Sequence, residues 1–188
     1  MKHKDLLIVI DMQNVYKEGQ PWGCCSVSTA SANIRKLIDS GVFGDNVVFT
    51  KFLAPIVPEG SWADYNRANA AINEDTYLNE MMEEFKSYLD KYPVLTKSTY
   101  SSFEIEELCE MAKEAEHVVL CGVVAECCVL STALSAIDKG YPVIYISDAV
   151  SGLSPITEAE AANIVSYLAP IQSEVMTTDQ YITGEIPE

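Results

Sequence analysis

The stretch VVLCGVVAECCVLSTALSAIDKGYPVIYISDA, residues 118–149, predicts a strand, a helix and a second strand. Its two β-branched runs, Val118–Cys121 and Val143–Ile146, are continuous rather than alternating, which is typical of strands buried on both faces of a parallel sheet. Between them, apolar side chains recur at the i, i+3, i+4 and i+7 positions of a helix, and Gly140 supplies its C-terminal stop. The stretch therefore predicts one β-α-β unit.

The same alternation continues on both sides of this unit. Further strands are predicted at Leu6–Ile10, Val47–Thr50, Val94–Thr96 and Val175–Thr177, and further helices at 28–39, 75–90, 104–115 and from Thr157 to about Leu168. Capping-box patterns at residues 101–104 and 157–160 mark the starts of the last two helices. We expect an α/β fold: a three-layer α/β/α sandwich with a mainly parallel, Rossmann-like six-stranded sheet, formed by one domain over residues 1–188.

The composition restricts the classes of function. Apolar residues make up 48% of the chain and the formal net charge is −16, so the chain is globular and lacks the basic footprint that nucleic acids and anionic membranes require. No apolar run approaches the length of a membrane span, and the run at Leu6–Ile10 is too short for a secretory signal. Six cysteines without a CxxC pattern or a Cys/His cluster argue against a disulfide framework and a zinc site. We expect a cytoplasmic protein without nucleic-acid or membrane partners.

One segment, residues 53–74, interrupts the alternation of strands and helices. It contains Pro55, Pro58, Gly60 and Trp62, and connections of this length in a compact domain are usually functional or interfacial. The sequence leaves open whether this segment forms a lid over a pocket or a contact between subunits.

Chemically active side chains follow several of the predicted strands. Asp11 follows the first strand, Lys97 the third, the turn Gly122–Cys128 the fourth and Asp148 the fifth. Because ligands of open α/β sheets bind outside the carboxyl ends of the strands, we expect an acid, a base and a thiol to share one edge of the sheet.

Cys128 is a candidate nucleophile because it opens the helix of the quoted stretch. Unpaired N–H groups, the positive end of the helix dipole and a nearby Lys97 ammonium are expected to lower the pKa of its thiol. Asp11 is a candidate acceptor of the thiol proton, and the same N–H groups are candidates for binding an oxyanion. However, a free cysteine in an apolar segment is usually core filler, and a carboxylate after a strand is often a turn former. The residues alone leave both interpretations open.

Four motifs give the chain a resemblance to a known family. They are LLIVIDMQN (6–14), KSTYSSF (97–103), GVVAECCVLSTALSAIDKGYPVIYISDA (122–149) and TEAEAANIVSYL (157–168). Through them the chain resembles the isochorismatase-like cysteine hydrolases, which include nicotinamidases and N-carbamoylsarcosine amidohydrolases. The resemblance implies a catalytic triad of Asp11, Lys97 and Cys128. It selects Cys128 over Cys127, because Val129 and a Thr-Ala pair follow Cys128 as they follow the family's cysteine.

The resemblance has further implications for the site. It implies a non-proline cis peptide at Val123–Val124 and an oxyanion hole formed by the N–H groups of Val124 and Cys128, and Gln13 matches a position that often lines the family's pocket. Nicotinamidases hold a metal through an Asp-x-His motif and further histidines after the second strand. Residues 50–69 here contain no histidine, so we expect no metal and no other cofactor. Family members commonly form dimers or tetramers, which predicts a homodimer or homotetramer.

We therefore expect a metal-independent cysteine hydrolase that cleaves a C–N bond of a small amide, ureido or carbamoyl compound through a thioester intermediate. Alternatives within the family are a nicotinamidase-type amidase and an isochorismatase-type vinyl-ether hydrolase, although some vinyl-ether-cleaving relatives lack the cysteine. Alternatives outside it are a thiol redox protein, using Cys127–Cys128 or Cys24–Cys25, and a binding protein with a silent site. The expected substrate contacts are the aromatic residues Phe52, Trp62, Tyr65, Tyr100 and Phe103, with Trp22 as a weaker candidate and Lys51 or Arg67 as partners of a substrate carboxylate.

Overall fold

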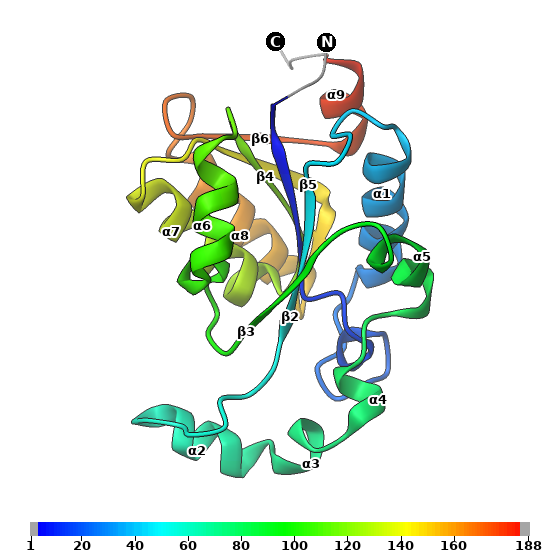
Figure 1. The fold of residues 1–188 in the computed structure, drawn as a ribbon, viewed down its shortest axis with the longest axis vertical. Helices are drawn as coiled ribbons and strands as arrows, with labels where there is room; N and C mark the ends of the chain where they lie inside the picture. Colours follow the sequence, from blue (N-terminus) through cyan, green and yellow to red (C-terminus); the bar gives the residue numbers. More distant parts are fainter. Residues whose placement is uncertain (1–3, 185–188) are drawn as a thin grey trace.

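The computed structural model describes residues 4–184 and contains one parallel sheet of six strands (Figure 1). The strands are β1 (Leu6–Ile10), β2 (Val47–Phe52), β3 (Val94–Lys97), β4 (Val118–Val123), β5 (Val143–Ser151) and β6 (Ser173–Met176). Their order across the sheet is β3-β2-β1-β4-β5-β6, so the winding direction switches between β1 and β4. Residues 1–3 and 185–188 of the one-domain prediction lie outside the described residues.

Helices cover both faces of the sheet (Figure 1). On one side lie α1 (Val27–Asp39), α5 (Lys86–Leu89) and α9 (Thr178–Thr183), and on the other α6 (Glu106–Lys113), α7 (Leu130–Asp138) and α8 (Pro155–Ser166). Alternate residues of β1 point into two cores: Leu7 and Val9 pack on the α1 side, whereas Ile8 and Ile10 pack on the side of α6 to α8. The predicted three-layer sandwich is confirmed. No helix within residues 4–184 is long and apolar enough to cross a membrane.

The acidic segment 75–90 is not the single helix that its apolar spacing predicts. The Asn14 N–H donates to the Glu80 carbonyl, and the Met82 N–H donates to the Met12 carbonyl, each at 2.9 Å. These bonds to the loop after β1 replace helical bonds, so the segment braces that loop. It contains three short pieces: α4 (Thr76–Asn79), a 3₁₀ turn (Glu83–Phe85) and α5.

Two helix starts also differ from the capping-box predictions. Ser101 caps a separate 3₁₀ turn, and α6 begins only after that turn. α8 begins at Pro155, two residues before its predicted start, because Ser154 and Thr157 form the capping box. Proline suits the first position of a helix, where its missing N–H needs no partner.

The segment 53–74 lies beyond the carboxyl ends of the strands, at the bottom of Figure 1. It contains α2 (Ser61–Ala68) and α3 (Ala70–Asn73), so it has more regular structure than its prolines indicate. Its position brings its side chains to the edge of the sheet where the chemically active residues are expected.

The ends of β1 and β4 approach so closely that only glycine fits at position 122. Gly122 pairs with Ile10 in the parallel register and has a φ of 112°. A Cβ at this position would lie 2.1 Å from the Ile10 carbonyl oxygen. The missing side chain therefore allows the strand ends that lead to Asp11 and to Cys128 to run side by side.

Candidate active site

Asp11 follows β1, and its buried carboxylate lies at the centre of the candidate site. Its backbone is left-handed, with a φ of 52°, a conformation that is uncommon outside glycine but accessible to aspartate. Oδ1 accepts a hydrogen bond from the Thr50 hydroxyl at 2.7 Å, and Oδ2 lies 2.6 Å from the Lys97 ammonium. These two contacts fix the orientation of the carboxylate.

Lys97 reaches this carboxylate from β3, two strands away in the sheet. Its buried Nζ also donates to the carbonyl oxygens of Thr99 at 3.0 Å and Tyr100 at 3.1 Å. Burial lowers the pKa of Lys97, but its interactions with Asp11 and Cys128 raise it by more, so the net pKa is raised. The ammonium therefore stays charged in the buried site.

Cys128 lies in a π-helical turn, Ala125–Val129, that connects β4 to α7. The Val124 carbonyl accepts from the N–H groups on both sides of Cys128, each at 3.1 Å. The peptide bond Val123–Val124 is cis, as the resemblance implies. Turns of this kind are rare and occur frequently at functional sites.

The two adjacent cysteines have different surroundings. The Cys128 thiol lies within hydrogen-bonding reach of both Asp11 and Lys97. Cys127 is half-buried, and the charge that acts on its thiol is that of Glu126. The structure therefore brings Cys128, rather than Cys127, to the predicted acid and cation.

The thiol of Cys128 does not have the lowered pKa that its position at a helix start predicts. Burial raises the pKa and the charge of Asp11 raises it further, whereas Lys97 lowers it by less, so the net shift is upward. Only 3% of the residue is exposed, and desolvation of a thiolate outweighs the helix dipole. The raised pKa favours the protonated thiol, beside the ion pair of Asp11 and Lys97.

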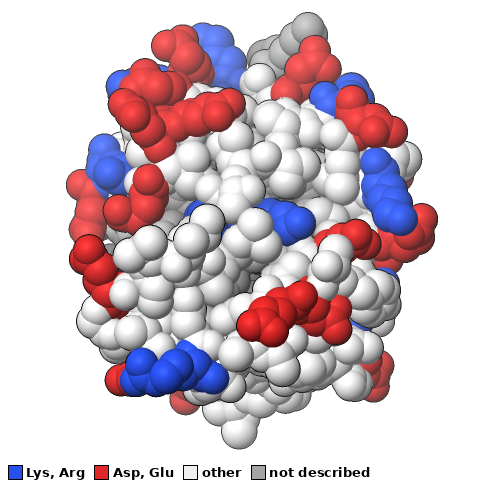
Figure 2. All heavy atoms as spheres, turned by 60° about the horizontal axis from the view of Figure 1, so that its bottom comes forward, with Lys and Arg blue, Asp and Glu red and all other residues white. Residues whose placement is uncertain are grey.

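A cavity of about 260 Å³ opens beside Cys128 and is rich in aromatic rings. Figure 2 brings this end of the molecule forward; Lys, Arg, Asp and Glu side chains lie around the margin of the face and also close to its hollowed centre. No Lys, Arg, Asp or Glu belongs to the lining of the cavity. The lining consists of Tyr16, Pro21, Trp22, Tyr65, Tyr100, Val124, Cys127, Cys128 and Leu153.

Four of the aromatic residues that were predicted to contact a substrate line the cavity or pack behind its lining. Tyr65 and Tyr100 line the cavity, as does Trp22, the weaker candidate. Trp62 lies behind them, with ring centroids 5.1 Å from Tyr65 and 5.2 Å from Tyr100. Phe52 joins the same cluster through its contact with Trp62 at 6.2 Å. The segment 53–74 thus supplies two of the rings.

Two predicted substrate contacts, Gln13 and Phe103, lie elsewhere. The Gln13 amide oxygen accepts from the Phe52 N–H at 2.9 Å, and its nitrogen donates to the carbonyls of Phe52 and Asn79, each at 3.0 Å. These bonds tie the loop after β1 to β2 and α4. Phe103 is buried in the same core cluster as Cys128, and its ring stacks on Tyr141 at 5.4 Å. Neither residue is among those that line the cavity, so a contact of either with a substrate stays a prediction.

The predicted charged partners also lie outside the cavity. Arg67 pairs with Asp64 on the surface of α2, and Lys51 is half-buried on β2. The Asp148 carboxylate accepts from the Thr178 N–H at 2.7 Å and from its hydroxyl at 2.8 Å, so it caps the start of α9. Neither Lys51 nor Arg67 lines the cavity, where it could pair with a carboxylate on a substrate.

Tyr16 is a residue of the cavity wall that the sequence analysis did not identify. It lies in a 3₁₀ turn five positions after Asp11, and its ring centroid is 5.8 Å from that of Trp22. Burial raises the pKa of its hydroxyl, and the negative charges of Cys128 and Asp11 raise it further. Its position in the loop after β1, five residues from Asp11, could have marked this aromatic residue as a candidate.

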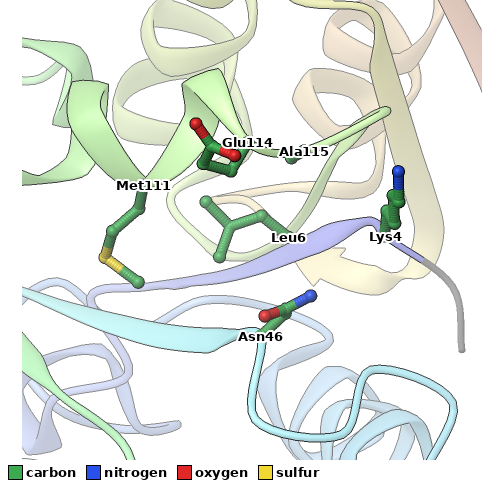
Figure 3. Close-up of a pocket in the computed structure, with 6 residues that line it drawn as sticks. All are labelled: Lys4, Leu6, Asn46, Met111, Glu114 and Ala115. Carbon is green, nitrogen blue, oxygen red and sulfur yellow. The ribbon is translucent and has the colours of Figure 1, made fainter.

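A second cavity, of about 230 Å³, lies near the start of β1 (Figure 3). Its lining contains one ammonium and one carboxylate but no thiol, hydroxyl or imidazole, so it offers no nucleophile beside a base. The second cavity is lined by Lys4, Leu6, Asn46, Met111, Glu114 and Ala115.

Within the described chain, no group of three or more His, Cys, Asp or Glu side chains is arranged to hold a metal.

Known proteins share this fold and sequence pattern. A family model described as the isochorismatase domain matches residues 5–180. The isochorismatase of Bacillus subtilis (strain 168) is 28% identical over 155 residues, which is 81% of this chain and 49% of that protein. The chain spans 33% or less of the length of two further curated relatives.

Solved structures cover nearly the whole chain. An isochorismatase-like hydrolase from Alkaliphilus metalliredigens superimposes with a TM-score of 0.74 at 25% identity, covering 96% of this chain and 98% of that one. A cysteine hydrolase from Pseudomonas syringae pv. phaseolicola 1448A gives a TM-score of 0.82 at 20% identity, covering 96% and 91%. At this identity the second likeness concerns the fold alone.

Proposed function

The chain belongs to the isochorismatase domain family, and from this membership we propose that it is a metal-independent cysteine hydrolase. Its substrate is a small amide, ureido or carbamoyl compound, in which it cleaves a C–N bond. The observation that carries the proposal is the buried contact of Asp11, Lys97 and Cys128 beside an aromatic cavity. A nucleophile in reach of a base and a fixed cation is the arrangement that covalent catalysis needs.

The first half of the reaction forms a thioester. Asp11 takes the Cys128 proton as the sulfur attacks the carbonyl carbon, and the C=O electron pair moves onto oxygen. The backbone N–H groups of Val124 and Cys128 receive this oxyanion. Asp11 then passes its proton to the nitrogen, the C–N bond breaks, and the amine leaves with the acyl group still on sulfur.

The second half releases the acid. Asp11 takes a proton from water as the water oxygen attacks the thioester carbon, and the C–S bond then breaks. The sulfur regains its proton from Asp11, which restores the resting site. Throughout, Lys97 holds Asp11 in place and offsets the negative charge that forms beside it on Cys128.

The cavity favours a small and neutral substrate. Its volume of about 260 Å³ and its aromatic wall suit one ring or a short chain. Lys51 and Arg67 do not line it, and the ammonium of Lys97 is already paired with Asp11, so a substrate carboxylate would lose its hydration without gaining a free cation. Retention of Cys128 favours C–N cleavage over the vinyl-ether reaction of relatives that lack the cysteine.

The test compares Cys128→Ala with Cys127→Ala as a matched control. Wild-type protein is screened against small neutral carboxamides, ureides and carbamoyl compounds for ammonia release. We expect Cys128→Ala to lower kcat/KM on any substrate found by at least about 10³-fold, and Cys127→Ala to change it by less than about tenfold. Intact mass after acid quench should show an acyl adduct on the wild type that Cys128→Ala lacks.

Hydrolysis that survives in Cys128→Ala would contradict the proposal. Loss in Cys127→Ala with retention in Cys128→Ala would move the nucleophile to the neighbouring sulfur. A metal requirement, seen as activity lost on chelation and restored by one cation, would contradict the metal-independent route.

A further inference from the structure

The wall of the aromatic cavity carries polar groups that no group of the protein satisfies. Within residues 4–184, the hydroxyls of Tyr16, Tyr65 and Tyr100 have no hydrogen-bond partner, although all three residues line the cavity. The indole N–H of Trp22, whose ring lies beside that of Tyr16, has none either. Polar groups that are removed from bulk water usually have a partner in folded proteins. These groups are therefore available to a molecule that enters the cavity.

Tyr16 is the most deeply placed of these tyrosines. It is 4% exposed, whereas Tyr100 is 41% exposed and Tyr65 lies between them. Its hydroxyl oxygen is nevertheless not enclosed by protein, so the accessible part of the residue faces the cavity. The Tyr16 carbonyl accepts from the Cys24 N–H at 2.9 Å, and its ring lies 5.8 Å from that of Trp22. The hydroxyl is thus held in place before a ligand binds.

The hydroxyls of the wall act as donors within range of the Cys128 sulfur. Burial raises the pKa of all three hydroxyls, and the negative charge of Cys128 raises each pKa further. The charge of Asp11 adds to the rise in the pKa of Tyr16. Phenols with a raised pKa keep their protons, and an indole N–H can only donate. The wall therefore offers a set of donors without a charged side chain among them.

A ligand that fits this wall needs hydrogen-bond acceptors of its own. In the proposed reaction, the N–H groups of Val124 and Cys128 hold the oxygen of the attacked carbonyl, so the donors of the wall need a different acceptor. A hydrocarbon group in the cavity would cover the hydroxyls and leave them unpaired. An anionic acceptor would find no free cation in the lining. The matching group is an uncharged acceptor, such as an ether oxygen or a second carbonyl.

We propose that Tyr16 is a specificity-determining residue, whose hydroxyl donates to a second, uncharged acceptor of the substrate. The inference rests on the proposed function, because that function assigns the first acceptor to the attacked carbonyl. It narrows the substrate class from small neutral amides in general to those that carry an ether or carbonyl oxygen beyond the scissile C–N bond. Tyr65 and Tyr100 donate in the same way to the part of the substrate nearer the opening of the cavity.

Binding to Cys128→Ala protein tests the proposal without turnover. The probes are cyclohexanecarboxamide and the isomeric tetrahydropyran carboxamides, in which an ether oxygen replaces one ring CH₂. We expect at least one tetrahydropyran isomer to bind at least about fivefold more tightly than cyclohexanecarboxamide, because it gives the Tyr16 hydroxyl a partner. Adding Tyr16→Phe should reduce this ratio to less than about twofold, since only the hydroxyl is lost and the ring beside Trp22 remains. Isothermal titration calorimetry measures the dissociation constants.

Tyr145→Phe is the matched control. Tyr145 is also buried, at 1% exposed, but it lies on β5 and is not among the residues that line the cavity. In the Cys128→Ala protein, this substitution should leave the ratio of the two dissociation constants unchanged. Melting temperatures within a few degrees of the parent protein show that each variant folds.

Equal binding of all the probes to Cys128→Ala protein would overturn the proposal, as would the failure of every probe to bind at about 20 mM. A preference for the ether oxygen that survives Tyr16→Phe, or that Tyr145→Phe abolishes equally, would overturn the assignment to Tyr16. Hydrolysis that survives in Cys128→Ala would overturn the proposed function instead, and it is measured separately, because the binding ratio needs no turnover.

Discussion

Asp11 controls the protonation of the Cys128 thiol in the resting site. Its charge is the strongest cause, after burial, of the raised pKa of that thiol. Lys97 acts in the opposite direction, but its ammonium lies 2.6 Å from Asp11, so its field at sulfur is largely offset. The nucleophile of the proposed reaction is therefore formed only as the proton moves to Asp11.

Asp11→Asn should change two properties of Cys128 in opposite directions. Hydrolysis should fall by about 10²–10⁴-fold, because the base is lost. Alkylation of Cys128 by iodoacetamide should become faster at pH 8, because one cause of the raised pKa is gone and more thiolate is present at a given pH. Peptide mass mapping over time measures the rate at this cysteine alone.

A Cys127→Ala background keeps the neighbouring thiol out of the alkylation measurement. In that background the protein with Asp11 intact should alkylate at Cys128 with a rate that rises through pH 7 to 9, without a plateau at neutral pH. Slower alkylation in Asp11→Asn would mean that the carboxylate promotes the thiolate in the resting site, contrary to the raised pKa.

The place of a side chain in the site was predictable where the residue directly follows a strand. Asp11, Lys97 and the cysteine turn each follow a strand, and parallel strands bring these positions to one edge. Gln13 was not predictable, because its partners are the backbones of Phe52 and Asn79, which only the fold brings near. The direction of the Cys128 pKa also depended on burial, which the helix-start argument did not include.

At the scale of secondary-structure elements, the close approach of the parallel strands β1 and β4 depends on Gly122, which has no side chain. Gly122→Ala should lower the free energy of unfolding by about 3–5 kcal/mol, because its Cβ would meet the Ile10 carbonyl oxygen at 2.1 Å and its φ is 112°. Gly140→Ala is the control: its φ is 86°, but a Cβ there meets nothing within 4 Å. It should lower the free energy of unfolding by only about 1–2 kcal/mol.

Urea denaturation of the two variants measures this difference. Equal losses would show that positive φ alone explains the cost, and that β4 can move away from β1 without penalty. Soluble Gly122→Ala protein should also lose hydrolysis, because Asp11 and Cys128 would no longer approach each other.

Elements with continuous apolar runs were predicted well, and those held by tertiary hydrogen bonds were not. All six strands lie where β-branched runs predict them, since burial on both faces leaves a clear pattern. The segment 75–90 has helical spacing, but its backbone bonds to residues 12 and 14 divide it. Local pattern cannot reveal a partner that is more than 60 positions away.

At the scale of the whole molecule, the class of the fold was predictable but the strand order was not. Alternating strands and helices fix a layered parallel sheet, whereas the order β3-β2-β1-β4-β5-β6 depends on how the crossovers pack. That order places Lys97 two strands from Asp11, a distance its long side chain spans. The aromatic cavity was only partly foreseen, because its lining comes from five segments, one after each of the strands β1 to β5.

The proton on Cys128 also bears on how the protein survives oxidative stress. Hydrogen peroxide attacks thiolates far more readily than thiols, and it needs access to the sulfur. Here the raised pKa favours the protonated thiol, and only 3% of the residue is exposed. Under the proposed function, the burial and raised pKa of Cys128 should make its oxidation by hydrogen peroxide slow.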